Sequence, residues 1–148
     1  MSEPKPLGMS FADFLTQIAG KTGLKVRTIS PSAVVVPFDM GEGRTQYVWV
    51  RAVGTDGRGN LLVGIYSPAL KMPEGQLLSR EAANELLREN INLAHGSWAI
   101  QKMEDGEYLV MFDTQIAQTM DPEEFAASVR GLAAAADAKE KSLGSDAF

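Results

Sequence analysis

The stretch from Ser79 to Leu143 most constrains the fold, because helix and strand patterns follow one another there with little connecting sequence. Ser79 suits a helix N-cap, since its hydroxyl can accept hydrogen bonds from the amides of the first turn. Positions 82, 83, 86, 87, 90 and 91 then recur at three- and four-residue steps, and all but Asn90 are apolar. This spacing predicts that they share one helical face, including Leu87 and Ile91. The stretch therefore opens with an amphipathic helix over residues 79–92.

Two strand-like runs follow this helix, at residues 97–103 and 107–114. Asp105-Gly106 lies between them, and Asp-Gly between two apolar runs is a strong signal for a β-hairpin. Both faces of the second strand are apolar. We therefore expect helices to cover one face of the hairpin, and a partner or another part of the chain to cover the other.

A long helix closes the stretch. The sequence Asp-Pro-Glu-Glu at residues 121–124 suits a helix start, because Asp can cap, Pro fits the first turn and carboxylates favour the positive end of the helix dipole. An apolar stripe follows, and the small side chains of residues 133–136 allow a neighbouring element to approach closely. We expect the helix to end near Leu143.

The first half of the chain predicts one helix and four strands. Ser10 and Asp13 form a capping-box-like pair, and the apolar face that follows ends at Gly23, a good helix stop. Turn residues separate four strand-like segments, and such short connections require antiparallel pairing. These segments are residues 24–29, 33–38, 45–53 and 61–66.

Residues 67–78 are predicted to be a linker across one edge of the sheet, because two prolines and a glycine interrupt any periodic pattern. Leu70 and Met72 are apolar residues within this segment. They either cap the core or form part of an interaction surface.

Length and composition predict one domain. A chain of 148 residues can build a proper core, and 45% hydrophobic with 22% charged residues is ordinary for a globular protein. We expect a single α+β domain at residues 9–143, a disordered lead at 1–8 and a flexible tail at 144–148. The predicted order is one helix, three or four strands, a second helix, two strands and a third helix, around an antiparallel sheet.

Several classes of function are disfavoured by composition. The chain has no cysteine, which excludes disulfides, a thiolate nucleophile and a zinc–thiolate site. A net charge of −5 argues against a nucleic-acid-binding surface. No signal segment is apparent, and no apolar run approaches the roughly 20 residues of a membrane helix. We therefore expect a cytoplasmic protein without nucleic-acid or membrane partners.

No group of residues predicts catalysis. His95 is the only histidine, and no partner nucleophile is visible in the sequence. The glycine-rich segments 41–44 and 56–59 join strand to strand, so hairpin turns explain them better than phosphate-binding loops. Helix capping accounts for the acidic residues of 121–124. We therefore expect no enzyme activity, no catalytic residue, no metal and no cofactor.

Aromatic residues indicate a binding surface. Tyr47, Trp49 and Tyr66 are expected on one sheet face. Either the first or last helix covers them, or they are exposed and form a binding face, since large exposed apolar patches mark contact sites. The candidate residues for a protein-binding or dimer surface are Tyr47, Trp49, Tyr66, Leu70, Met72, Trp98, Ile100 and Met111.

The chain resembles the YbjN-type family of bacterial sensory transduction regulators. The likeness spans residues 9–143 and lies mainly in Leu-Leu-Arg-Glu-Asn at 86–90, the strand pair around Trp98 and Phe112, and the acidic helix start at 121–124. That family is similar in fold to the type III secretion chaperones, although a fourth strand candidate departs from them. The resemblance implies helices on an antiparallel sheet, a homodimer, and binding of protein segments without catalysis.

The sequence therefore predicts a non-enzymatic protein-binding module, chaperone-like or regulatory. Two alternatives stay open. One is a small-ligand sensor with a pocket between the sheet and the closing helix, which a deep cavity dotted with polar groups would favour. The other is a structural homodimer subunit whose apolar faces are covered by self-association.

Overall fold

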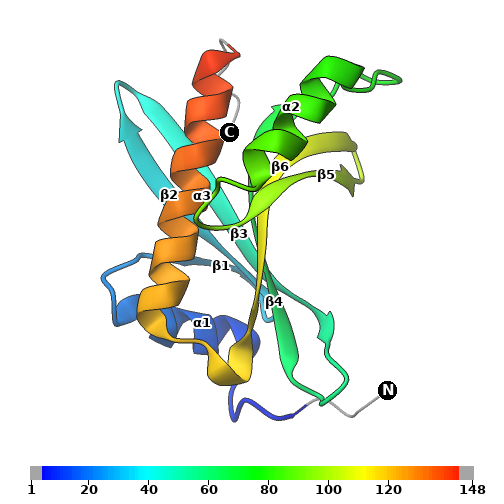
Figure 1. The fold of residues 1–148 in the computed structure, drawn as a ribbon. Coiled ribbons are helices and arrows are strands. Elements are labelled where there is room, and N and C mark those ends of the chain that lie inside the picture. Colours follow the sequence, from blue (N-terminus) through cyan, green and yellow to red (C-terminus); the bar gives the residue numbers. More distant parts are fainter. Residues whose placement is uncertain (1–4, 144–148) are drawn as a thin grey trace.

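The computed structural model describes residues 5–143, which form three α-helices, one 3₁₀ helix and a six-stranded antiparallel sheet (Figure 1). The α+β class predicted from the sequence is confirmed. In chain order the elements are α1 (Phe11–Gly20), β1 (Arg27–Ser30), β2 (Ala33–Gly41), β3 (Arg44–Thr55), β4 (Leu61–Lys71), α2 (Arg80–Asn90), β5 (Ser97–Met103), β6 (Gly106–Ile116), η1 (Ala117–Thr119) and α3 (Pro122–Ser142).

The strands are arranged in the order β1-β2-β3-β4-β6-β5, and every neighbouring pair is antiparallel. The first four strands form the predicted meander. Strand β6 lies between β4 and β5, so β1 and β5 are the two edges. Figure 1 shows all three α-helices on the same side of the twisted sheet. We call that side the inner face and the opposite side the outer face.

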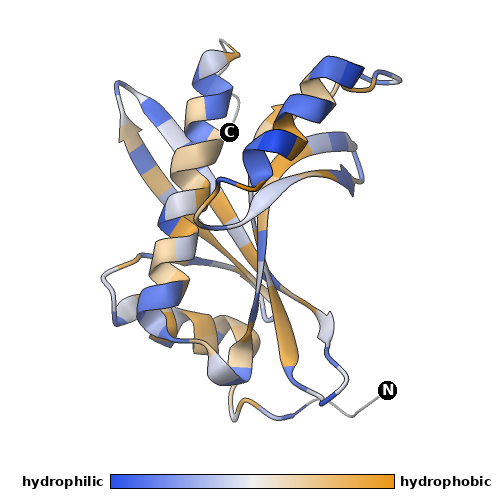
Figure 2. Cartoon of the chain, viewed as in Figure 1, coloured by the Kyte–Doolittle hydropathy of each residue, from blue (hydrophilic) through white to orange (hydrophobic). Residues whose placement is uncertain are grey.

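The core fills the space between the inner face and helices α1 and α3. Alternate strand residues contribute to it, and Figure 2 shows hydrophobic strand segments behind α3. From the strands it contains Val34, Val36, Val48, Val50, Val63 and Ile65. From the helices it contains Phe11, Leu15, Phe125, Val129 and Leu132. The period-two pattern of β2, β3 and β4 therefore places one set of side chains under the helices.

The predicted helix starts are confirmed by their caps. The side chains of Ser10, Ser79 and Asp121 each accept a hydrogen bond from a first-turn amide, at 3.1, 3.1 and 2.7 Å. These bonds satisfy amides that have no partner within the helix. Local chemistry therefore sets where all three helices begin.

The predicted linker at residues 67–78 is wrong in its first part, because β4 continues to Lys71. Strand β6 pairs with this extension, so that Ser67 lies opposite Met111 and Lys71 lies opposite Tyr108. Strand β6 lies some 40 residues later in the sequence, so local turn signals in residues 67–78 cannot predict this pairing.

Pairing between β3 and β4 ends where Pro68 enters β4, since proline has no N–H for the ladder. The register between these strands ends at Tyr66. Beyond it, the buried Gln46 Nε2 donates to Ser67 Oγ at 2.8 Å and to the Pro68 carbonyl at 2.7 Å. Ser67 Oγ donates to the Tyr47 carbonyl at 2.7 Å. Side-chain hydrogen bonds thus replace the backbone ladder at this seam.

The last turns of α3 are tied to two other elements. Arg44 of β3 lies 2.9 Å from the Asp137 carboxylate and 3.4 Å from that of Glu140, which is fully buried. Lys139 Nζ lies 3.0 Å from Glu89 Oε1 of α2. A buried carboxylate needs such a cation, because an unpaired charge would be costly there.

The terminal segments are only partly described. The predicted disordered lead, residues 1–8, includes four residues outside the described range. Lys5 N donates to the Gly59 carbonyl at 2.8 Å and Leu7 packs against the core, so residues 5–8 contact the domain. The predicted tail, residues 144–148, lies outside the described residues.

Two glycines with the same left-handed backbone allow a controlled test of packing. Gly96 has φ +71° and Gly75 has φ +74°. A Cβ at Gly96 would lie 2.8 Å from the Phe112 carbonyl oxygen and 2.9 Å from Leu132 Cδ1, whereas none of the neighbouring atoms lies within 4 Å of one at Gly75.

We expect Gly75→Ala to lower the free energy of unfolding by about 1–2 kcal/mol, the usual cost of a left-handed alanine. Gly96→Ala should lower it further, because the clash adds to the backbone cost. Urea denaturation of both variants measures the difference. Equal losses would show that Gly96 is not a close-packed position.

Candidate protein-binding surface

An apolar groove of about 290 Å³ lies between α2 and the edge strand β5. Its walls include Leu78, Leu86, Leu87, Trp98, Ile100 and Leu109. Leu86 and Trp98 are buried at its base, while Leu87 and Ile100 are 67% and 48% exposed. Such a lining suits apolar side chains better than a charged small molecule.

Two further exposed apolar residues flank α2 in the sequence, outside the lining of the groove. Leu77, just before α2, is 81% exposed, and Ile91, just after it, is 87% exposed. Single exposed apolar residues need no explanation, but several of them on and beside α2 indicate a contact surface. We call Leu77, Leu87, Ile91 and Ile100 the α2 rim.

Sequence reasoning left this rim out of the candidate surface, although it placed Leu87 and Ile91 on one apolar face of the helix. Only Leu86 is buried within α2. Successive helical residues differ by about 100° around the axis, so Leu87 points well away from Leu86. The adjacent leucines were the available signal, since a helix with one apolar stripe cannot bury both at its centre.

Trp98 fixes the base of the groove and joins three elements. Its Nε1 donates to Glu89 Oε2 of α2 at 3.0 Å. Lys139 Nζ of α3 lies 5.4 Å from the centroid of the ring and also pairs with Glu89. Trp98 is only 8% exposed. Its side chain is therefore almost fully buried at the base of the groove, where it positions α2 over β5, and its predicted role in a binding surface stays a prediction.

Asn90 covers one end of the free edge of β5. Its Oδ1 accepts from the Trp98 backbone N at 2.6 Å, and its Nδ2 donates to the Trp98 carbonyl at 3.5 Å. These backbone groups point away from β6, so in an antiparallel ladder those of Ile100 and Lys102 point the same way. The edge beyond Trp98 is therefore open to an added strand, with Lys102 as the charged residue typical of such edges.

Tyr47, Trp49 and Tyr66 share one sheet face, as predicted, and it is the outer face. Trp49 lies directly opposite Tyr66 in the register. The alternating residues Val48 and Val50 point into the helix-covered core, so α1 and α3 pack on the other side of the sheet from these rings. Tyr47 and Trp49 are partly exposed, whereas Tyr66 is 4% exposed.

Three further candidates belong to the core. Met111 is 0% exposed and Met72 is 6% exposed, so neither lies on an accessible surface and both predictions are wrong. Leu70 is partly buried and packs against the core. Leu70 and Met72 therefore both pack with the core, which is one of the two roles that the sequence allowed. Ile100 alone of the later candidates is substantially exposed.

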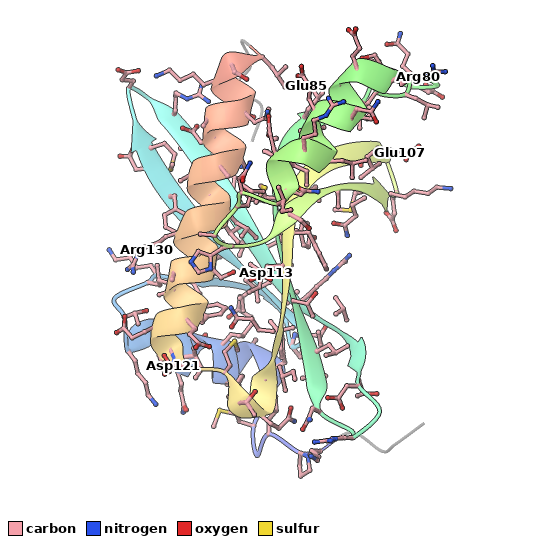
Figure 3. The ribbon with its side chains drawn as sticks, in the orientation of Figure 1. Arg80, Glu85, Glu107, Asp113, Asp121 and Arg130 are labelled. Carbon is pink, nitrogen blue, oxygen red and sulfur yellow. The ribbon has the colours of Figure 1, made fainter. Side chains whose placement is uncertain are left out.

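The polar groups nearest to a catalytic pattern have other partners. Ser128 Oγ of α3 donates to Asp113 Oδ2 of β6 at 2.6 Å, and Figure 3 shows Asp113 beside α3. His95 packs against the backbone at Gly131, where an added Cβ would lie 3.3 Å from its ring. The serine thus bonds a carboxylate and not an imidazole, unlike a Ser-His-Asp triad. Across residues 5–143, no three His, Cys, Asp or Glu side chains gather as a metal site requires.

A wider hollow of about 890 Å³ opens between residues 71–77 and the hairpin turn 102–107. At its side, Tyr108 Oη donates to Asp105 Oδ2 at 2.7 Å, and Lys71 Nζ lies 3.2 Å from the same oxygen. The Tyr108 hydroxyl, followed by Lys71, holds the pKa of the Asp105 carboxyl below its usual value. Asp105 in turn raises the pKa of Lys71. Lys71 and Asp105 are exposed and Tyr108 is partly exposed, and the three side chains together join β4 to the hairpin.

No protein-family model and no curated protein sequence matches this chain. In the part of the chain that the structure describes, no helix is both long and apolar enough to cross a membrane. The resemblance to YbjN-type regulators therefore stays a prediction.

Asn90 allows a test of the capped strand edge. Asn90→Ala removes the partner of the Trp98 amide, so we expect the free energy of unfolding to fall by about 1–3 kcal/mol. The exposed Asn92 is the control, and Asn92→Ala should change it by less than about 0.5 kcal/mol. Amide hydrogen exchange at Trp98 should also accelerate. An unchanged exchange rate in Asn90→Ala would contradict the cap.

The Asp105 cluster predicts a pH dependence. Because the folded pKa of Asp105 is lowered, its stabilising effect is present above the unfolded value of about 3.9 and is lost as the pH falls through the folded value. Tyr108→Phe removes the largest cause, so the Asp105 pKa should rise. An NMR titration of the Asp105 carboxyl carbon measures this, with Tyr47→Phe as control. Identical titration curves for Tyr108→Phe and the unaltered protein would exclude the hydrogen bond in solution.

Proposed function

We propose that this chain is a non-enzymatic protein-binding module, chaperone-like or regulatory, which holds an extended segment of a partner protein beside β5. One observation supports this most directly. The α2 rim exposes four large apolar side chains, with exposures from 48% at Ile100 to 87% at Ile91, next to an open strand edge. A soluble domain that leaves such a surface uncovered is suited to covering it with a partner.

The mode of binding follows from the two parts of the surface. A partner strand would exchange backbone hydrogen bonds with Ile100 and Lys102 at the edge of β5. Its alternate side chains would enter the groove beside Leu87, because residues of a strand alternate between two faces. This is recognition by strand addition, in which backbone bonds supply affinity and side-chain pockets supply specificity. Asn90 would mark the end of the bound segment.

The family resemblance agrees with this proposal. A YbjN-type regulator with a fold like that of the type III secretion chaperones would be cytoplasmic and would bind protein segments without chemistry. The six-stranded sheet with three helices on one side is compatible with such a fold. Within this proposal, the partner-binding groove lies under α2.

A homodimer is the second candidate, and the same rim favours it. Leu87 and Ile91 of one copy could be covered by those of another across a two-fold axis, which requires a self-complementary patch. Light scattering distinguishes a monomer that binds a partner protein from a homodimer. A dimer that dissociates on Leu87→Arg would assign the rim to self-association.

The first experiment is an affinity pull-down of the tagged protein from its host lysate. We expect Leu87→Arg to reduce recovery of the partner by at least about tenfold. The substitution removes an apolar side chain and places a charge in the interface, and a change at the centre of an interface costs about 2 kcal/mol or more of binding free energy. Ile29→Arg is the matched control, since Ile29 is 51% exposed and lies on β1 at the opposite edge of the sheet. Circular dichroism confirms that both variants are folded.

A partner recovered equally by Leu87→Arg and the unaltered protein would contradict binding at the groove. A reproducible turnover activity abolished by one pocket substitution would overturn the non-enzymatic proposal as a whole.

A further inference from the structure

The outer face of the sheet carries a row of rings that the α-helices do not cover. In the register, Val35 lies opposite Trp49, Trp49 opposite Tyr66, and Tyr66 opposite Phe112. Residues opposite each other in an antiparallel sheet point to the same face. Four neighbouring strands therefore contribute one continuous apolar row, which ends at Ser97 on β5.

Two members of this row are buried, and the other two form a partly exposed platform, which we define as Trp49 and Phe112 together with Tyr66 between them. Val35 and Tyr66 are 2% and 4% exposed, although neither belongs to the core cluster under the helices. Trp49 and Phe112 are partly exposed, and Val53 on the same strand as Trp49 is 47% exposed. The platform is thus dense enough to exclude water beneath it, yet its upper side is open.

Two arginines stand at this platform without a carboxylate partner. Arg51 is exposed, and its Cζ lies 5.3 Å from the centroid of the Tyr66 ring. Arg27 of β1 lies opposite Val35 and is also exposed. Within residues 5–143 neither forms an ion pair. Their guanidinium groups keep N–H donors available for an incoming carboxylate.

This cationic face stands out against the acidic chain, which has 19 acidic and 14 basic residues. Most carboxylates of the described residues lie on helices and turns. Among the strand residues that point to the outer face, the one carboxylate is Asp39, at the far end of β2, where its Oδ1 accepts from Gly41 N. The charge of the platform therefore differs in sign from that of the whole protein.

We propose that the outer face is a second docking surface, and that it binds an acidic segment of a partner protein in which apolar and acidic side chains alternate. The apolar side chains would pack on Trp49 and Phe112. A carboxylate would form a two-pronged ion pair with Arg51, whose guanidinium is already positioned over Tyr66. This surface is separate from the α2 rim, so the proposal does not rest on the groove.

Single-stranded nucleic acid is the other polymer that aromatic rings and arginines can bind. The observations favour the acidic peptide, because two unpaired arginines are few for a phosphate backbone and the chain carries a net charge of −5. Binding of an RNA probe is therefore included in the test as a contrary outcome.

The two tryptophans of the chain provide separate reporters. In a Trp98→Phe background, Trp49 is the single tryptophan and reports on the outer face. The probes are two synthetic peptides, (Phe-Glu)₄ and (Phe-Lys)₄, titrated against the full chain while Trp49 emission is recorded. We expect (Phe-Glu)₄ to bind at least about tenfold more tightly, which corresponds to about 1.4 kcal/mol.

Charge reversal locates the binding site. Arg51→Glu should abolish the preference for (Phe-Glu)₄ or reverse it towards (Phe-Lys)₄. Arg58→Glu changes the net charge equally, at an exposed position in the β3–β4 turn, and should leave the preference intact. Circular dichroism verifies folding, and Arg51→Met retains the side-chain packing on Tyr66 if Arg51→Glu does not fold.

Four outcomes would overturn the proposal. The first is equal affinity for the two peptides, and the second is an equal effect of Arg51→Glu and Arg58→Glu on the peptide preference. The third is Arg51-dependent binding of oligo(U) in preference to (Phe-Glu)₄. The fourth is peptide binding that Leu87→Arg abolishes but Arg51→Glu does not. The last outcome would move the peptide to the groove and support the proposed function alone. Loss of partner binding at the groove, with Arg51-dependent peptide binding intact, would contradict the proposed function and support the outer-face proposal alone.

Discussion

The packing of α3 on the inner face is the contact on which the rest of the structure depends. Phe125, Val129 and Leu132 are all fully buried, and α3 contacts β2, β3, β4 and β6 as well as α1. Burying a large apolar side chain stabilises a fold by roughly 1.5–3 kcal/mol. The last turns of the same helix also hold Arg44 and Glu89, so one helix positions the β2–β3 hairpin and α2 together.

Features determined by neighbouring residues were predictable from the sequence, and those determined by distant contacts were not. The caps at Ser10 and Ser79 and the Asp-Gly hairpin turn depend on residues a few positions apart. The extension of β4 through Pro68 depends on β6, which lies far along the chain. The residues of the candidate surface also fall into a predictable and an unpredictable group. Period-two alternation placed Tyr47, Trp49 and Tyr66 on one face, but the burial of Trp98 and the exposure of Leu87 depend on where α2 docks.

One-sided coverage of the sheet explains why two surfaces stay available for binding. All three α-helices lie on the inner face (Figure 1), so the outer face relies on its own rings for cover. At the edge, Trp98 is buried beneath α2, where Asn90 bonds its backbone, whereas Ile100 is 48% exposed. The two surfaces differ in character: the α2 rim is purely apolar, whereas the outer face combines aromatic rings with Arg51. They therefore suit different kinds of polypeptide segment.

The hydrogen bonds of Gln46 and Ser67 at the junction of β3 and β4 have a consequence for the outer face. Strands β1, β2 and β3 form one half of the sheet, and β4, β6 and β5 form the other, with continuous backbone pairing between the halves only from Tyr66 towards the β3–β4 turn. Past that point the Gln46 amide and the Ser67 hydroxyl link them through side-chain hydrogen bonds. Helix α3 also spans this junction, because it contacts β2 and β3 on one side and β4 and β6 on the other. Since Trp49 lies on β3 and Phe112 on β6, the same side-chain bonds and the same helix fix the spacing of the rings that any ligand of the outer face would meet.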